Sequence, residues 1–332
     1  MLDSIVLVCD RVDSLSEIDL YSDNLEFTSP VYYNALYAAL CECARQVHVY
    51  SSPKELIDNI ALHQDSLVLS AIWSGVQSRN RKSLIAAICE AYKIAYLGAD
   101  TFVQTICQDK YLSKLICSNY GLEIPQGVLV DNSIGASDLR LINYPAIVKP
   151  NCEGSSIGIS DDSIAYDHQD AHRKARNLLR GFKPILVEEY IEGVEVSICL
   201  AGTRERVQVC EAVMLKVNGM SHFNNQIWGF ESKKGGQAYC EREIITKEVD
   251  PKVLHEAKRL FYELGKVDYM RIDGRIRQGK FYLIELTPDC SLHPECFMST
   301  AFCHTGHSYT AMVKALVELS QKATPLTPGN QY

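Results

Sequence analysis

Short apolar segments alternate with helical patterns over the first third of the chain. Apolar runs that are too short for helices predict buried strands at 4–9, 46–50 and 67–72. The accompanying helical patterns lie at 31–45 and 79–92. Because strands that alternate with helices favour parallel pairing, this part of the chain predicts a parallel sheet covered by helices.

The middle of the chain has the pattern of a compact unit that follows a boundary. A helix predicted at 106–120 stops at Gly121, and Pro125 lies in the turn after it, so we expect a domain boundary there. Beyond the boundary the pattern predicts a strand, a Gly- and Ser-containing loop, a polar helix and an apolar strand. Their expected ranges are 145–150, 151–158, 167–181 and 185–190.

Longer strands are expected in the final third. The pattern predicts strands at 194–200 and 206–216, then a helix, a hairpin and a last helix at 308–320. The first of these helices is amphipathic, and its apolar stripe consists of Val253, Ala257, Leu260, Phe261 and Leu264. Residues 323–332 have the composition of a loose tail.

Composition excludes some classes of function but does not identify one. The 332 residues are 47% hydrophobic and 22% charged, which is typical of a globular protein with two or three domains. A net charge of -8 offers no basic surface to a phosphate backbone, so nucleic acid is not an expected partner. The N-terminal apolar run is too short for a signal peptide or a membrane span, so we expect a cytoplasmic protein with no membrane partner. For the same reason the 13 cysteines are expected to be reduced.

The most informative segment is YMRIDGRIRQGKFYLIELTPD, in which a turn joins two strands that carry carboxylates. Side chains alternate along a strand, so Arg271 and Asp273 share one face. Glu285 and Thr287 likewise share a face of the partner strand. Pairing centred on Gly279 places Asp273 opposite Glu285, where the two charges repel unless a cation lies between them. Carboxylates are ligands for Mg²⁺, so the pattern predicts a magnesium site; a solvent-facing row of surface ion pairs is the alternative.

Two further segments suit nucleotide binding. Lys149 ends a strand just before the loop EGSSIG, in which glycines let the backbone approach a phosphate and serines add hydroxyl donors. The loop is neither a Walker motif nor a dinucleotide fingerprint, and a plain surface turn is the alternative. Downstream, in ILVEEYIEGVEVSI, Glu188 and Glu195 flank a short acidic hinge. The alternative is that both glutamates are simply exposed to solvent, as most glutamates are.

Taken in order, six motifs resemble the ATP-grasp superfamily, and within it the D-alanine:D-alanine ligase branch. They are Lys110 in QDKYLSK, Lys149 in IVKP, EGSSIG at 153–158, the segment from Glu188 to Glu195, RID at 271–273 and Glu285 in IELT. The likeness covers residues 94–320 and depends on the order and spacing of the motifs. It implies an α/β ATP-grasp fold with an N-terminal parallel α/β domain, a small α+β lid domain and a C-terminal α+β domain with a mostly antiparallel sheet. The expected domains are 1–108, 109–190 and 191–322, followed by the tail.

The resemblance also implies roles for individual residues. ATP phosphates are expected to contact Lys110 and Lys149 beneath a lid formed by Glu153, Gly154, Ser155, Ser156 and Ile157. The adenine hinge is expected at Glu188, Glu189, Tyr190 and Ile191, with Glu195 on the ribose. One or two Mg²⁺ ions are expected at Asp273, Glu285 and Thr287. Catalytic roles fall to Arg271, Lys233 and Ser156, where Arg271 steadies the anionic intermediate.

Several positions depart from the family pattern. Thr287 stands where the family has asparagine, which weakens the case for a second metal ion, although Asp289 could compensate. The N-terminal segment lacks the branch's glycine pair after the first strand, and Lys234 replaces an aromatic residue beside Lys233. The candidate substrate contacts are Glu17, Lys234, Ser291 and His293. These departures argue that the substrates differ from two D-alanines.

Three functional hypotheses follow. The first is a carboxylate–amine ligase of a specialised biosynthetic pathway, which forms an amide through an acyl phosphate and takes at least one amino acid as substrate. The second is a D-alanine:D-alanine ligase of cell-wall synthesis. The third is an ATP-binding pseudoenzyme, which Thr287 motivates. Many enzymes of this size form twofold dimers, so a homodimer is the assembly that we expect if the chain associates.

Overall fold

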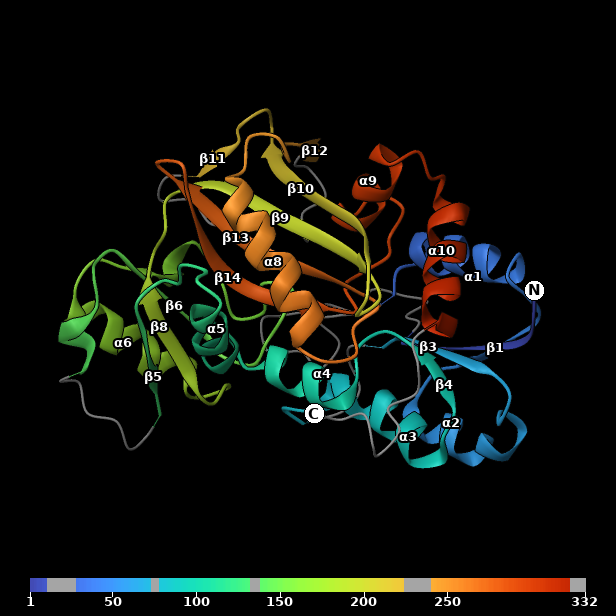
Figure 1. Cartoon of the computed structure of the whole chain (residues 1–332). Coiled ribbons are helices and arrows are strands. Elements are labelled where there is room, and N and C mark those ends of the chain that lie inside the picture. The colour runs from blue at the N-terminus through green and yellow to red at the C-terminus, as the bar shows by residue number, and fades with distance from the viewer. Residues whose placement is uncertain (11–27, 73–77, 132–137, 224–239, 323–332) are drawn as a thin grey trace.

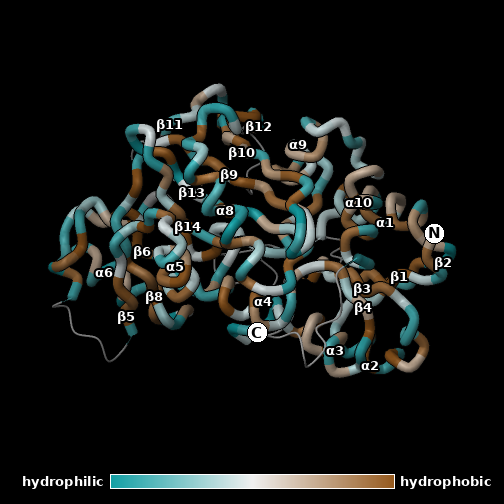
Figure 2. Tube along the Cα trace, in the orientation of Figure 1, coloured by the Kyte–Doolittle hydropathy of each residue, from teal (hydrophilic) through white to brown (hydrophobic). Residues whose placement is uncertain are grey.

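The computed structural model describes residues 1–10, 28–72, 78–131, 138–223 and 240–322. The described residues form three sheets that follow one another along the chain, and helices pack against and between them (Figure 1). Hydrophobic and hydrophilic residues alternate along the elements of all three parts, rather than gathering in one of them (Figure 2). None of the described helices has the length and apolar character needed to cross a membrane.

The N-terminal sheet is parallel, with the strand order β2-β1-β3-β4, as the alternation of strands and helices predicted. Both faces of β1 are covered, because Ile5 and Leu7 enter one core while Val6 and Val8 enter another. The strands are β1 (Leu2–Cys9), β2 (Ala44–Tyr50), β3 (Leu67–Ala71) and β4 (Ala95–Leu97). The helices are α1 (Pro30–Cys41), α2 (Pro53–Asp58) and α3 (Leu84–Tyr92), with short 3₁₀ turns η1 (Ile60–Leu62) and η2 (Arg81–Ser83). The next helix, α4 (Thr101–Gln108), packs against the third sheet through Val103 and Cys107.

The second sheet is small and antiparallel, with the order β5-β8-β6-β7. One of its faces packs on α6, where Ala171 and Ala175 are fully buried against Val148 and Val187. Its strands are β5 (Gly127–Val130), β6 (Ala146–Pro150), β7 (Ile164–Ala165) and β8 (Ile185–Glu189). Its helices are α5 (Lys110–Asn119) and α6 (His168–Leu178), with 3₁₀ turns η3 (Asp138–Leu141) and η4 (Asp161–Ser163).

The third sheet is antiparallel, with the order β12-β10-β9-β13-β14, and β11 pairs with β9. One face packs on α8 through Ile198, Leu200 and Ile272, while Cys199, Val213 and Tyr269 face α9 and α10. The strands are β9 (Gly193–Gly202), β10 (Val207–Val217), β11 (His222–Phe223), β12 (Cys240–Ile244), β13 (Tyr269–Arg277) and β14 (Lys280–Pro288). The helices are α8 (Pro251–Glu263), α9 (Phe297–His304) and α10 (Tyr309–Lys322).

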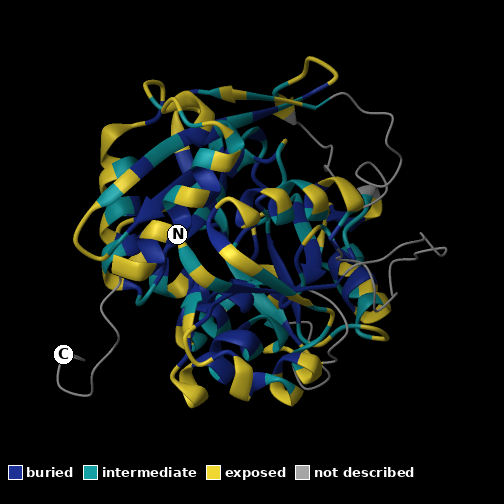
Figure 3. Ribbon diagram, turned by 90° about the vertical axis from the view of Figure 1, so that its right-hand side faces the viewer, coloured by how far each residue is buried: buried dark blue, intermediate teal, exposed yellow. Residues whose placement is uncertain are grey.

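The last two helices connect the third sheet to the N-terminal part. Phe302 of α9 and Leu316 of α10 share one buried core with Leu36 of α1. Buried residues lie in the inner strands, and exposed residues lie on outer helix faces and loops (Figure 3). The N-terminal sheet and the third sheet therefore share a core across the part of the molecule where the functional residues gather.

The helix predicted at 106–120 is wrong as a single element. Two helices, α4 and α5, meet at Asp109, whose backbone is extended (φ −91°, ψ 101°) and whose carboxylate accepts the Leu112 N–H at 3.0 Å. Asp109 is thus the N-cap of α5, a role that aspartate commonly takes. The break places Lys110 in the first turn of a new helix. The pattern also missed α9, and the predicted helix at 79–92 begins as η2 before α3.

The hairpin of β13 and β14 pairs Asp273 with Glu285, as predicted, but by a different route. The turn residues are Gln278 (φ 53°) and Gly279 (φ 78°), which is typical of a two-residue type I′ turn. From that turn a regular ladder pairs Gly274 with Leu283, so Asp273 would face Ile284. A bulge between Asp273 and Gly274 adds one residue on β14 and restores the pairing of the two carboxylates.

Replacing Gly274 by alanine is expected to lower the free energy of unfolding by about 1–3 kcal/mol, because the added Cβ overpacks the bulge. That Cβ would lie 2.5 Å from the Tyr282 carbonyl oxygen and 2.4 Å from the Phe281 ring. Urea unfolding measures the loss. Gly279→Asn is the control, because a Cβ there meets nothing within 4 Å and asparagine tolerates a left-handed backbone. Equal effects of both substitutions would contradict the account of the bulge.

Candidate active site

A cavity of about 630 Å³ lies where the three parts of the chain meet. Most residues predicted from the sequence line it: Lys110, Lys149, Glu153, Gly154, Ser155, Ser156, Glu188, Glu189, Tyr190, Ile191, Glu195, Arg271, Asp273, Glu285, Thr287, Ser291 and His293. The side chain of Ile157 is buried (5% exposed) and is not among the lining residues. Glu17, Lys233 and Lys234 lie outside the described residues.

Two lysines and one glutamate form a fully buried charged cluster at one end of the cavity. Lys149 Nζ lies 2.7 Å from Glu188 Oε1, and Lys114 Nζ contacts Glu188 Oε2. Burial lowers the pKa of Lys114 to about 8, although the Glu188 charge opposes the shift. For Glu188, burial raises the pKa, but the two lysines outweigh it and hold the pKa below its ordinary value. This end of the cavity therefore carries one more positive charge than negative when all three groups are ionised.

Lys110 connects the loop after β6 to the carboxylate hairpin. Its ammonium group donates to the Glu153 carbonyl oxygen and lies 3.3 Å from Glu285 Oε1. The side chain is only 4% exposed, so its charge acts in a region of low dielectric constant. Lys110 and Lys114 are four residues apart on α5 and therefore lie on the same helix face.

The loop after β6 has a strained backbone. Ser155 (φ 50°), Ser156 (φ 63°) and Gly158 (φ 70°) all have left-handed conformations. For the two serines such a conformation costs of the order of 1 kcal/mol or more each, and strained backbone of this kind clusters at ligand sites. A Cβ at Gly158 would lie 2.6 Å from Pro150, which explains why glycine stands there.

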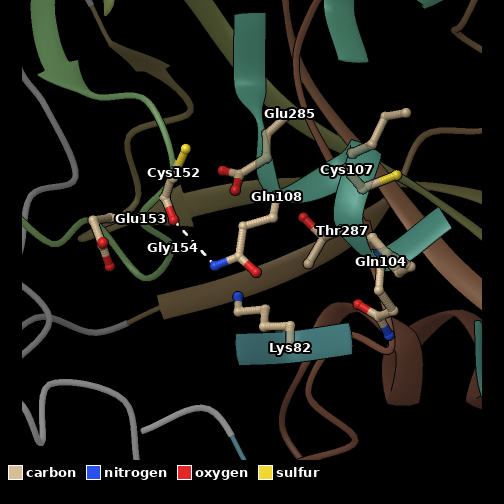
Figure 4. Close-up of a pocket in the computed structure, with 11 residues that line it drawn as sticks. Lys82, Gln104, Cys107, Gln108, Cys152, Glu153, Gly154, Glu285 and Thr287 are labelled. Carbon is tan, nitrogen blue, oxygen red and sulfur yellow. Dashed lines mark hydrogen bonds between the residues drawn. The ribbon is translucent and has the colours of Figure 1, made fainter. Parts of the chain in front are cut away.

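Two arginines of the N-terminal part contact the loop after β6 and the N-cap of α5. Arg81 Nη2 donates to Glu153 Oε2 at 2.6 Å, and Arg79 Nη2 donates to Asp109 Oδ2 at 3.4 Å. Figure 4 shows how Lys82 of η2, Gln108 of α4, Glu153 of the loop and Glu285 of β14 surround a small recess beside the main cavity.

Arg271 and Asp273 form a second ion pair on β13, and both side chains are partly buried. Arg271 Nε and Nη2 donate to the two Asp273 oxygens at 3.1 and 3.0 Å, which is a bidentate arrangement. Ser197 donates to Asp273 Oδ1 at 2.6 Å, and Thr287 donates to Oδ2 at 2.9 Å. Burial raises the pKa of Asp273, but Arg271 and these hydrogen bonds outweigh it, so the pKa lies below its ordinary value. Asp273 is therefore ionised at neutral pH.

The donor set of the hairpin fits Mg²⁺. Asp273, Glu285 and Thr287 offer oxygen atoms to one cavity, and the two carboxylates are directly paired across the strands. Within the described ranges, no group of three or more His, Cys, Asp or Glu side chains gathers as a metal site. Mg²⁺ commonly takes one or two carboxylates and completes its shell with phosphate oxygens and water, so two carboxylates in a nucleotide cavity are sufficient.

The segment that joins β8 to β9 is held by arginines of β13. Arg275 Nη1 donates to the Ile191 carbonyl oxygen at 2.9 Å, and Nη2 lies 3.5 Å from Glu195 Oε2. Arg277 Nη1 donates to Glu189 Oε1 at 2.8 Å. The hinge is therefore fixed to the third sheet by three contacts.

The far end of the cavity contains His293 and Ser291. His293 Nδ1 accepts the Glu295 N–H at 3.1 Å, and Ser291 Oγ accepts the His293 N–H at 3.2 Å. The His293 ring lies 6.1 Å from the Tyr32 ring of α1, centroid to centroid. Burial lowers the pKa of His293, and the charge of Arg242 lowers it further despite Glu295. In the neutral ring the proton is therefore on Nε2, because Nδ1 acts as an acceptor.

Comparison with known proteins decides the family. The family model for the D-ala D-ala ligase C-terminus matches residues 129–318, which is more than half of the chain. The chain belongs to this family.

Curated relatives agree with this assignment. A D-alanine–D-alanine ligase from Helicobacter pylori is 26% identical over 208 residues, which cover 61% of this chain and 57% of that protein. The chain therefore spans little more than half the length of this relative. A D-alanine–D-alanine ligase from Maridesulfovibrio salexigens is 24% identical over 251 residues, which cover 74% of this chain and 78% of that protein.

A solved structure confirms the fold. The chain resembles the D-alanine–D-alanine ligase from Bacillus anthracis, which was crystallised with ATP, with a TM-score of 0.73. The sequence identity is 16%, and the match covers 96% of this chain and 98% of that one. The predicted α/β ATP-grasp fold, with one parallel and two antiparallel sheets, is therefore confirmed. The domain limits at 108/109 and 190/191 stay predictions.

Sequence reasoning missed several residues that line this cavity or contact its lining residues. Lys114 could have been found, since it is four residues after Lys110 on one helix. Arg275 could have been found by strand alternation from Asp273. Ser197 and Arg81 gave no local signal, because β9 and η2 bring them to the site from distant segments.

Proposed function

We propose that this protein is an ATP-dependent carboxylate–amine ligase that forms an amide and releases ADP and phosphate. The single observation that carries the proposal is the convergence of Lys110, Lys149, Arg271, Asp273 and Glu285 on one cavity. Membership of the ligase family and the names of the relatives support the same activity. The candidate substrates are a small carboxylate and an amine, at least one of them an amino acid.

The cationic side chains suit the transfer of a phosphoryl group. In the first step a carboxylate oxygen bonds to the γ-phosphorus of ATP and the bond to the β-phosphate oxygen breaks, so that ADP leaves and an acyl phosphate remains. Lys110 and Lys149 would neutralise the charge that spreads over the phosphoryl oxygens. Asp273 and Glu285 would hold Mg²⁺, which would supply positive charge to the phosphate groups.

The second step joins the amine to the activated carboxylate. The amine nitrogen attacks the acyl carbon, the carbon–oxygen bond to phosphate breaks, and the nitrogen loses a proton as phosphate leaves. Arg271, which Asp273 and the Phe297 ring hold in place, would stabilise the tetrahedral oxyanion. The loop with Ser155 and Ser156 and the Arg81–Glu153 contact would exclude water, which would otherwise hydrolyse the acyl phosphate.

The adenosine part of the nucleotide is proposed to bind at the hinge, next to Lys149. The hinge from Glu188 to Ile191 would hold adenine, and Glu195 would bind the ribose hydroxyls. Arg275 supports both parts, because it contacts the Ile191 carbonyl oxygen and the Glu195 carboxylate. Lys233 and Lys234, outside the described residues, stay candidates for a substrate-covering loop.

Two substrate assignments remain in competition. The names of the relatives favour D-alanine for both the carboxylate and the amine. The departures at the candidate substrate positions, among them His293 at the far end of the cavity, favour a different pair.

A phosphate-release screen with Mg-ATP and pairs of amino acids tests the proposal. Release is expected only when a carboxylate and an amine acceptor are both present, because the acyl phosphate is protected until the amine arrives. Release with D-alanine alone supports the cell-wall assignment, and release with another pair supports the specialised one. ATP binding without turnover of any pair contradicts the ligase proposal and supports a pseudoenzyme.

A further inference from the structure

Lys82 of η2 lies where the main cavity meets the small recess beside it. The recess has a volume of about 20 Å³, which is enough for one water-sized group. Figure 4 shows the Lys82 side chain directed into the recess, toward Gln108. The residues that line both the recess and the cavity are Lys82, Glu153, Gly154, Glu285, Thr287 and Pro288.

The turn that carries Lys82 is fixed on both sides of this residue. Before it, Arg81 Nη2 donates to Glu153 Oε2 at 2.6 Å. After it, Ser83 is buried and its hydroxyl donates to the Asn80 carbonyl oxygen at 2.8 Å. The N-terminal part therefore holds the backbone of Lys82 in one place against the loop after β6, and such positioning is what a group that acts on a bound substrate needs.

Gln108 presents an unused acceptor to the same recess. Its side chain is buried, and its Nε2 atom donates to the Cys152 carbonyl oxygen at 3.2 Å, which fixes the orientation of the amide. The opposite atom, Oε1, has no hydrogen-bond partner among the residues that the structure describes. A buried acceptor without a partner is costly, so the recess suits a donor. An ammonium group has three donors and could serve Gln108 and a ligand together.

The charges around the recess oppose a second divalent ion. Within the described ranges, the charged side chains that line it are Lys82, Glu153 and Glu285. Glu153 is paired with Arg81, and Glu285 Oε1 lies 3.3 Å from Lys110 Nζ. The lining residues and their ion-pair partners thus carry one more positive charge than negative before any metal ion binds. Like charges repel strongly in a region of low dielectric constant, so a further divalent ion is disfavoured there.

Few oxygen ligands remain on the hairpin for a second ion. Thr287 offers one hydroxyl oxygen, and this hydroxyl already donates to Asp273 at 2.9 Å. Asp289, which could compensate, instead accepts the Ala99 N–H at 2.8 Å and the Gln104 amide at 2.5 Å. Mg²⁺ needs a near-octahedral shell of oxygen atoms. One Mg²⁺ at the paired carboxylates is therefore compatible with this donor set, whereas a second is poorly supplied.

We propose that the ATP-loaded site holds a single Mg²⁺ and that the Lys82 ammonium group contacts the terminal phosphate from the recess, where a second ion would otherwise lie. This inference rests on the proposed ligase function and adds a catalytic lysine from the N-terminal part. Metal ions in phosphoryl-transfer sites bind the β- and γ-phosphates, so a group beside Glu285 faces the terminal phosphate. Its positive charge would stabilise the charge that spreads over the transferring group.

Lys82→Met is expected to weaken the binding of Mg-AMP-PNP, a non-hydrolysable ATP analogue, about tenfold to a hundredfold, because a hydrogen bond between charged groups is lost. The affinity for Mg-ADP is expected to change less than about threefold, because ADP has no γ-phosphate. Lys82→Arg is expected to lie between, since arginine keeps the charge but has a different shape. Isothermal titration calorimetry measures these affinities. A merely structural role of Lys82 would weaken the binding of both nucleotides alike.

Lys54→Met is the matched control. Lys54 lies on α2 in the same part of the chain, where its exposed side chain pairs with Asp58 and does not line the cavity. The substitution removes the same charge in the same way. Both nucleotides are expected to bind this variant with wild-type affinity.

The number of metal ions is measured with Mn²⁺, which takes the same carboxylate and water ligands as Mg²⁺. Equilibrium dialysis of the wild type with saturating AMP-PNP and excess Mn²⁺ counts the ions bound for each bound nucleotide. Electron paramagnetic resonance then distinguishes an isolated Mn²⁺ from a spin-coupled pair. One isolated ion is expected.

The outcomes separate this inference from the ligase proposal. A loss of affinity confined to AMP-PNP, with one Mn²⁺ in the wild type, supports the role of Lys82. Two Mn²⁺ ions in the wild type overturn it, as does a Lys82→Met protein whose affinity for AMP-PNP is unchanged or whose affinities for both nucleotides fall equally. Because these measurements need no turnover, a wild type that binds nucleotide but turns over no pair contradicts the ligase proposal alone. A wild type that does not bind AMP-PNP contradicts both.

Discussion

Replacement of Asp273 by asparagine is expected to lower the rate of phosphate release about a hundredfold to a thousandfold. The substitution removes a charge that would hold Mg²⁺ and at the same time leaves Arg271 without its bidentate partner. Losses of this size are typical when one preorganised electrostatic contact to a transition state is removed. Steady-state phosphate release with saturating Mg-ATP and the substrates found in the screen measures the effect.

Glu285→Gln separates the metal from the arginine. Glu285 contacts Lys110 but not Arg271, so its loss would remove a ligand without leaving Arg271 unpaired. We expect a similar loss of activity and an increase in the Mg²⁺ concentration that gives the half-maximal rate. Asp65→Asn, an exposed substitution of the same kind, is the control for expression and folding. Wild-type rates in both hairpin variants would remove Asp273 and Glu285 from the metal site.

The hairpin shows which features of a structure a sequence pattern can predict and which it cannot. Strand alternation correctly placed Asp273 opposite Glu285, but the symmetric turn assumed for that pairing is not the one observed. The turn has two residues, and an irregularity at Gly274 compensates for the difference. Local propensity predicts where a chain turns, whereas a bulge depends on packing against Phe281 and Tyr282, which no local pattern contains.

The prediction of one helix at 106–120 was wrong for a related reason. The apolar spacing from 106 to 120 is compatible with one helix, but Asp109 caps α5 and also accepts a hydrogen bond from Asn151 Nδ2 at 2.7 Å. Asn151 lies on the loop after β6, so the break depends on a tertiary contact. Most residues predicted by motif order line the cavity, although Ile157 does not. Ser197 and Arg242 come from β9 and β12, where strand alternation predicts which side chains share a face but not what that face contacts.

Glu188→Gln is expected to destabilise the second sheet, β5-β8-β6-β7, by about 3–5 kcal/mol, because two buried ammonium groups would remain without an anion. Urea unfolding and hydrogen exchange of the β6 and β8 amides measure the loss. The pKa of Glu188 lies below its ordinary value of 4.5, so its ionisation stabilises the fold above that pH. The difference between wild type and variant is therefore expected to shrink as pH falls below 4.5.

Lys114→Met is the matched control, and its stability is expected to depend on pH in a different way. Lys149 still neutralises Glu188, so stability near pH 7 is expected to stay within about 1 kcal/mol of the wild type or to rise, since a desolvated charge is replaced by an apolar chain. Between pH 8 and 10.5 the unfolded wild type binds more protons at Lys114 than the folded protein does. The free energy of unfolding of the wild type relative to Lys114→Met should therefore increase with pH across that window, because the folded protein releases the Lys114 proton at a lower pH than the unfolded chain does. A flat difference across this range would mean that Lys114 keeps its ordinary pKa, and the charge assigned to this end of the cavity would have to be revised.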